Sequence, residues 1–231
     1  ACVTLAGFAL RLVEIVTSDE QQLHALADAL ATFGARGRKA GSENVSGRAI
    51  LFAAETRALA IRQRAPGDRP DTACSLNNVG NSLEAIGDRA AGVALQREAL
   101  EMWRRLYAGV DHPGLAASLS NVGISLEAMG DRAEGVALQR EALAMCRRLY
   151  AGADHPDLAA SLGNVGISLE EMGDRTEGIA LKREALDMWR RLYGGLDHPG
   201  LANALGNVGN SLEAMGERAA GVALKREALE M

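Results

Sequence analysis

Three histidines, each between an aspartate and a proline, are the residues whose types and spacing most suggest chemistry. The motif occurs as Asp111-His112-Pro113, Asp154-His155-Pro156 and Asp197-His198-Pro199. An imidazole beside a carboxylate could bind a metal ion or act in acid–base catalysis. However, the three motifs fall in equivalent loops that should lie one structural repeat apart, too far to share an ion with bonds of about 2 Å. We therefore expect a structural loop role and no metal site.

Other catalytic and cofactor motifs are missing. The glycines form no GxxxxGK[ST] loop and no strand-linked GxGxxG, and there is no GxSxG or HExxH motif. The cysteines, Cys2, Cys74 and Cys146, are far apart and form no CxxC pair, which favours a reducing compartment. We find no catalytic constellation, and we predict a non-enzymatic cytoplasmic protein without a cofactor.

Composition excludes two further classes of partner. The net charge is −5 and no basic block stands out, so the sequence does not predict nucleic-acid binding. No uninterrupted apolar run reaches the roughly 18–20 residues that span a bilayer. Residues 1–16 are fairly apolar, but Arg11 and Glu14 interrupt them and no basic segment precedes them, so we do not interpret them as a signal peptide.

The histidine motifs belong to an internal repeat of 43 residues. Asn-Val-Gly recurs with the same spacing, and residues 112–154 and 155–197 are identical at 33 of 43 positions. Such a repeat of 20–50 residues is typical of a solenoid.

One repeat, residues 112–154, predicts two helices. Leu119, Val122, Leu126 and Met129 follow the spacing of one helix face. Pro113 suits the first turn of a helix, and Gly130 suits its end. Because the link to the second helix is short, the two helices should be antiparallel, and neighbouring pairs must stack to cover their apolar faces. The sequence therefore predicts an all-α solenoid of antiparallel helix pairs.

Four clear copies and a weaker one make up the array. The clear copies cover about 70–110, 113–153, 156–196 and 199–231, within 70–231. A degenerate pair is predicted for 18–69, with the Gly/Arg-rich stretch 34–47 joining its helices. Residues 1–17 predict a leading helix, interpreted as the end of an upstream element.

The repeat resembles a long tetratricopeptide repeat of the kinesin-light-chain-like type, whose pattern is similar to HPxxAxxLxNLAxxYxxxGxYxEAxxLxxRAL. The match runs through His112-Pro113, Ala116, Leu119, Asn121, Gly130, Glu134, Leu138 and Ala142-Leu143. It covers 70–231 well and 18–66 poorly. The resemblance implies a right-handed superhelix in which the first helices of the pairs line a concave groove.

Two departures from that pattern are clear. Leu126 and Arg132 stand where the family usually has aromatic residues. Glycine replaces the usual small residue, alanine, in the middle of each second helix, at Gly92, Gly135, Gly178 and Gly221. Because each mid-helix glycine costs about 0.5–1 kcal/mol relative to alanine, we expect a softer or differently curved array.

Three rows of residues are candidates for ligand contact on the first helices. On a helical wheel, Asn121, Ile124 and Glu127 point roughly away from the apolar face, and the resemblance places them in the groove. The rows are Asn78, Asn121, Asn164 and Asn207; Asn81, Ile124, Ile167 and Asn210; and Glu84, Glu127, Glu170 and Glu213. The asparagines could bind the backbone of an extended peptide, and the glutamates would favour a basic partner.

Other interpretations of these residues stay open. The asparagines could cap helices or bond between repeats, and the glutamates could form a solvated face or pair with arginines. Trp103, Cys146 and Trp189 share one repeat position, and Tyr107, Tyr150 and Tyr193 share another, which we interpret as packing between repeats.

Two functions follow as hypotheses. The first is an interaction scaffold that binds a protein or peptide segment, basic or extended, in the groove. The alternative is a structural or sensory arm of a larger signalling protein, such as an NTPase or protease. Such an arm would act through intramolecular contact or through self-association of its terminal repeats.

Overall fold

The computed structural model describes residues 45–230; residues 1–44 and 231 lie outside the described part. The helix predicted for 1–17 and the first helix of the pair predicted for 18–69 therefore fall outside the described residues. The described elements are all helices: α3 (Val45–Arg62), α4 (Pro70–Ala85), α5 (Arg89–Leu106), α6 (Pro113–Met129), α7 (Arg132–Leu149), α8 (Pro156–Glu171), α9 (Arg175–Tyr193), α10 (Pro199–Ala214) and α11 (Arg218–Leu229). None of the helices between residues 45 and 230 is long and apolar enough to cross a bilayer.

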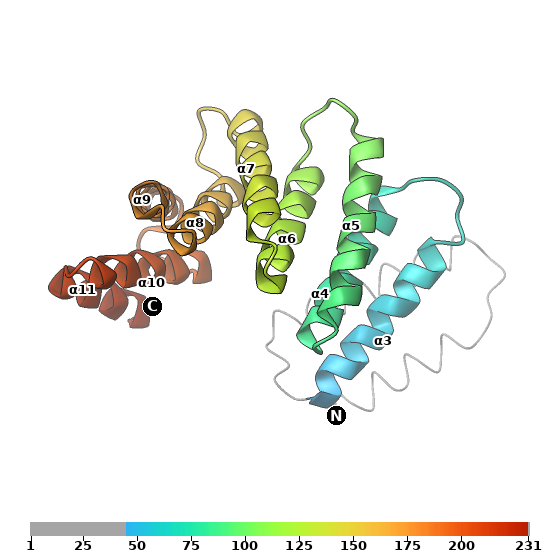
Figure 1. Cartoon of the computed structure of the whole chain (residues 1–231), viewed down its shortest axis with the longest axis horizontal. Helices are drawn as coiled ribbons and strands as arrows, with labels where there is room; N and C mark the ends of the chain where they lie inside the picture. The colour runs from blue at the N-terminus through green and yellow to red at the C-terminus, as the bar shows by residue number, and fades with distance from the viewer. Residues whose placement is uncertain (1–44, 231) are drawn as a thin grey trace. The chain divides into compact units, whose positions relative to one another are not determined.

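The chain divides into two compact units, residues 1–108 and 109–231. The described part of the first unit is α3 with the pair α4/α5. The second unit contains the pairs α6/α7, α8/α9 and α10/α11 (Figure 1). Each pair is a first helix and a second helix joined by a short turn, and the predicted all-α fold is confirmed for the described residues.

Each pair is held by a core of aliphatic side chains. Leu119, Leu162 and Leu205 occupy the same position of α6, α8 and α10, and none of the three has any exposed surface. Small residues of the second helices, such as Ala142 and Ala185, are buried as well. Burial of a leucine side chain stabilises a fold by about 1.5–3 kcal/mol, so one recurring residue contributes a large share of each core.

The histidines of the Asp-His-Pro motifs begin the first helices. In each case Nδ1 accepts a hydrogen bond from the backbone N–H two residues later, at Gly114 (3.0 Å), Asp157 (3.2 Å) and Gly200 (3.1 Å). The imidazole rings of His155 and His198 also stack on tyrosines of the preceding second helix, with ring centroids 3.6 and 3.8 Å apart. All three histidines therefore cap helices, and His155 and His198 also join neighbouring copies of the second unit.

The aspartates of the same motifs pair with arginines at the ends of second helices. Asp111 accepts two hydrogen bonds of 2.7 Å from Arg148, and Asp154 accepts two of 2.7 Å from Arg191. In the first unit Asp68 pairs with Arg105 in the same manner. The guanidinium groups hold the pKa values of these carboxyls below their usual range. Each clamp fastens the start of a copy to the end of its second helix.

Glycines let the two helices of a pair approach closely. A Cβ atom on Gly123 of α6 would lie 2.7 Å from the carbonyl oxygen of Gly135 in α7, and one on Gly135 would lie 2.6 Å from the oxygen of Gly123. The same reciprocal contact joins Gly166 to Gly178 and Gly209 to Gly221. The mid-helix glycines are thus sites of backbone contact, which accounts for a residue that helix propensity disfavours.

Candidate functional site

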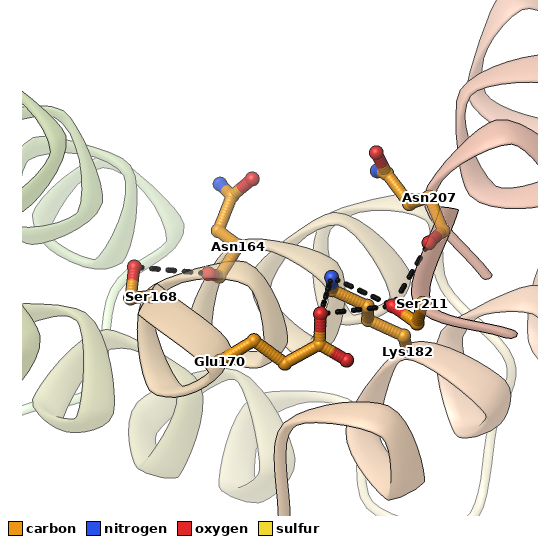
Figure 2. Close-up of polar contacts among 6 residues, drawn as sticks. All are labelled: Asn164, Ser168, Glu170, Lys182, Asn207 and Ser211. Carbon is orange, nitrogen blue, oxygen red and sulfur yellow. Dashed lines mark hydrogen bonds and ion pairs between the residues drawn. The ribbon is translucent and has the colours of Figure 1, made fainter. Parts of the chain in front are cut away.

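The asparagine row lies on the first helices. Asn121, Asn164 and Asn207 of the second unit are half-buried, as is Asn78 on α4 of the first unit. Figure 2 shows the amides of Asn164 and Asn207 extending to the same side of their helices, away from a cluster formed by Glu170, Lys182 and Ser211. Asn164 Nδ2 is 3.4 Å from Ser120 Oγ, a long hydrogen bond between α8 and α6.

Two equivalent depressions open beside these amides, one repeat apart. The first, about 230 Å³, lies between α6 and α8 and includes Asn121 and Asn164 in its lining. The second, about 240 Å³, lies between α8 and α10 and includes Asn164 and Asn207. Each depression therefore has an asparagine amide on both sides, where it could meet a peptide backbone.

The middle row is less uniform. Ile124 is 44% exposed and lines a third depression of about 490 Å³ together with Ile167. Asn210 is exposed, whereas the half-buried Asn81 accepts a hydrogen bond of 2.8 Å from Gln96 of α5. The two isoleucines of this row therefore form an apolar surface, whereas one of its asparagines is exposed and the other is hydrogen-bonded within its helix pair.

The glutamates contact neighbouring helices. Glu170 accepts hydrogen bonds from Lys182 of its own pair (2.7 Å) and from Ser211 of the next pair (2.9 Å), as Figure 2 shows. Glu213 pairs with Lys225 at 2.6 Å. In the first unit Glu84 is half-buried at the end of α4, where a Cβ on Gly92 would lie 2.7 Å from its Cγ.

Glu127 occupies the same position in a cluster without a lysine. It accepts hydrogen bonds from Gln139 of α7 and from Ser168 of α8, the latter at 3.0 Å. Gln139 thus stands where the following copy has Lys182. The serines were missed from the sequence, although Ser82, Ser125, Ser168 and Ser211 recur with the same spacing of 43 residues. That recurrence on buried helix positions was the signal that could have identified them.

We expect the stability of the fold to depend on pH through the titration of the Glu127 carboxyl. Burial is the main cause that raises the pKa of its carboxyl; the hydrogen bond from Ser168 opposes it, and the charge of Glu171 adds to it. Because the folded protein holds this proton more tightly than the unfolded chain, the stabilisation is complete below the unfolded pKa of about 4.3 and is lost as pH rises through the folded pKa. The melting temperature of the wild type should therefore fall relative to Glu127→Gln as the pH rises above about 4.

Asp154→Asn is the matched control, because Arg191 lowers the pKa of Asp154. Its stabilising contribution is present above the unfolded pKa of about 3.9 and is lost as pH falls, the opposite sign. Thermal melts followed by circular dichroism measure both differences. Parallel pH profiles for the wild type and Glu127→Gln would contradict the assignment.

Comparison with known proteins gives one family and several similar structures. The model of the tetratricopeptide repeat matches residues 71–148, 115–175 and 157–231, together more than half of the chain. No curated protein sequence matches the chain.

The similar structures share the fold at low sequence identity. One contains nearly identical TPR-like repeats of a kinesin light chain assigned in Podosopora anserina, with 15% identity and a TM-score of 0.67 over 93% of this chain and 96% of that one. BtubC (BKLC) from P. vanneervenii has 18% identity and a TM-score of 0.73 over 97% and 85%. A Rap protein complexed with Competence and Sporulation Factor has 12% identity and a TM-score of 0.72 over 99% and 58%. At these identities the likeness concerns the fold alone.

Proposed function

The chain belongs to the tetratricopeptide repeat family, whose members are generally non-enzymatic scaffolds for protein–protein interaction, and we propose that it binds an extended peptide segment along its first helices. One observation carries the proposal: in the second unit, Asn121, Asn164 and Asn207 flank two equivalent depressions one repeat apart. Amides at a regular spacing suit the backbone of an extended chain, which offers donors and acceptors at regular intervals.

The glutamate row has a different part in this proposal. Glu127 and Glu170 already accept hydrogen bonds from neighbouring helices, so their first role is to join repeats. The asparagines are better placed for ligand contact, since the amides of Asn164 and Asn207 extend away from that polar cluster (Figure 2). We therefore assign binding of the peptide backbone to the asparagines. The glutamates join the repeats and do not contact the peptide in this proposal.

A double substitution tests the proposal. Peptides are selected on the intact chain from a phage-displayed library of random dodecapeptides, and the affinity of one selected, fluorescein-labelled peptide is measured by fluorescence anisotropy. Asn121→Ala combined with Asn164→Ala should weaken binding at least about tenfold, because each lost hydrogen bond contributes about 1 kcal/mol. The control Arg183→Ala, an exposed change on α9, should leave affinity unchanged.

Two results would contradict the proposal. The first is a library that yields no binding peptide. The second is an affinity that the double substitution leaves equal to that of Arg183→Ala, with both variants folded by circular dichroism.

A further inference from the structure

Two of the positions at which the copies differ change together in the middle of the second unit. The position held by Trp103 and Trp189 carries Cys146, and the position held by Gly114 and Gly200 carries Asp157. At Trp103/Gly114, Cys146/Asp157 and Trp189/Gly200 the two positions are 11 residues apart and change together. In the first unit Asp71 holds the second position, and no tryptophan precedes it. Residues 112–154 and 155–197 are identical at 33 of 43 positions, and a pair of positions that changes together needs a physical explanation.

The two positions are in contact in the copy that keeps tryptophan. Trp189 stacks on His198 with ring centroids 5.1 Å apart, and a Cβ atom on Gly200 would lie 2.6 Å from the indole ring. The indole therefore leaves no room for a side chain at position 200. With cysteine at position 146 that restriction is removed, and Asp157 occupies the equivalent place, where its carboxylate accepts a hydrogen bond of 2.9 Å from the Tyr150 hydroxyl.

Cysteine and aspartate in place of tryptophan and glycine put an apolar residue and an acidic one into the lining of the depression between α6 and α8. Ala116, Ala117 and the buried Cys146 supply apolar lining, while the side chain of Asp157 lies in the same lining and is 60% exposed. Burial raises the pKa of the Cys146 thiol, and the charge of Asp157 adds to this, so the sulfur is uncharged at neutral pH. No lysine or arginine lines this depression.

The equivalent depression between α8 and α10 differs in each of these respects. It has Trp189 and Gly200 at the two positions, and its one lysine, Lys182, is buried and paired with Glu170 at 2.7 Å. Two adjacent sites of nearly equal volume therefore offer different surroundings: an acidic site with an apolar lining, and an aromatic site without an available charge.

We propose that the depression formed by Ala116, Ala117, Cys146 and Asp157 is a specificity subsite for a lysine or arginine side chain of the bound segment. The proposal rests on the peptide-binding function proposed above. The methylene stem would lie against the alanines and the cysteine, since long basic side chains bury their stems along apolar surface. The cationic group would pair with the carboxylate of Asp157. The net charge of −5 favours such a partner over an acidic one.

Exchange of the paired residues between copies tests this proposal, because each variant uses a combination that the chain already contains. Random dodecapeptides displayed on phage are selected on the wild type, on Cys146→Trp/Asp157→Gly and on Trp189→Cys/Gly200→Asp. The wild type should enrich lysine or arginine at one position of the aligned peptides. The first variant should lose that preference, and the second should gain another basic position at a fixed offset from the first.

Affinities of synthetic peptides make the test quantitative. Replacement of the selected basic residue by norleucine, which keeps the stem without the charge, should weaken binding to the wild type about tenfold. The same replacement should change binding to Cys146→Trp/Asp157→Gly less than twofold. Asp157→Asn preserves the shape of the site and should also abolish the difference between the two peptides, which keeps the test decisive if the paired variant does not fold.

The outcomes separate this proposal from the proposed function. Binding peptides without a basic position, or a basic preference that survives in Asp157→Asn, would overturn the subsite and leave peptide binding intact. The same holds if Asp157→Asn changes only the melting temperature, because Asp157 would then act only on the first turn of α8. A library without binding peptides would overturn both.

Discussion

Replacing Gly166 by alanine is expected to destabilise the second unit, although alanine stabilises most helices relative to glycine. Gly166 lies in the middle of α8, where a Cβ atom would be 2.7 Å from the carbonyl oxygen of Gly178 and 2.8 Å from Cγ of Lys182. The backbone oxygen cannot move unless α8 and α9 separate. Such overpacking costs about 1–3 kcal/mol, which exceeds the gain of about 0.5–1 kcal/mol in helix propensity.

Gly163 provides a control in the same helix. A Cβ atom at this position meets nothing within 4 Å, so Gly163→Ala should gain the ordinary propensity advantage of about 0.5–1 kcal/mol. Guanidinium unfolding measured by circular dichroism should therefore move the midpoint down for Gly166→Ala and up for Gly163→Ala. If both substitutions stabilise the protein, the helices of the pair do not depend on the glycine contact.

Replacing Glu170 by alanine is expected to cost about 3 kcal/mol, the lower end of the range for breaking a buried ion pair. Lys182 is 6% exposed and pairs with Glu170 at 2.7 Å, with Ser211 of α10 completing the cluster. Without the carboxylate, the ammonium group stays buried beside one hydroxyl. The loss should appear as a large drop in melting temperature.

The preceding copy shows how this cluster can work without a charge pair. There Gln139 takes the place of Lys182 and contacts Glu127 and Ser168. Lys182→Gln should therefore change stability by less than about 1 kcal/mol, since it recreates an arrangement found in the chain. The double variant Glu170→Ala/Lys182→Gln should be more stable than Glu170→Ala, because it buries no lone ammonium. A double variant as unstable as Glu170→Ala would show that the ion pair is not the cause.

The helix pairs could be predicted because their signals are local and repeated. The proline after each histidine, the glycine after each first helix and the apolar face of Leu119, Val122 and Leu126 all act within one helix or its ends. The mid-helix glycines led to the expectation of a softer array, because propensity describes only the helix that contains the glycine. Their role depends on the distance to a second backbone, which a propensity scale does not contain.

The helix face that carries the candidate residues could be predicted from the sequence, but the hydrogen-bond partners of those residues could not. The helical wheel identified Asn121 and Asn164, and both line a depression. The same wheel grouped Glu127 with them, whereas the structure places its carboxylate between Gln139 and Ser168. A long side chain at the end of a helix reaches residues of the next two helices, so its partners depend on the packing of those helices. The surroundings of Cys146 likewise depend on packing, because Asp157 of the next helix pair lines the same depression.

The stacks of tyrosine on histidine have a consequence for how this chain could change length. The copies at residues 112–154 and 155–197 each carry a histidine at the start and a tyrosine near the end. Each joint therefore combines a tyrosine of one copy with the histidine of the next, as at Tyr150–His155 and Tyr193–His198. A duplicated segment of 43 residues therefore arrives with both halves of the joint and needs no new interface. Recombination between near-identical copies could add or remove one helix pair at a time, and would shift the Asp157 subsite along the array without changing its chemistry.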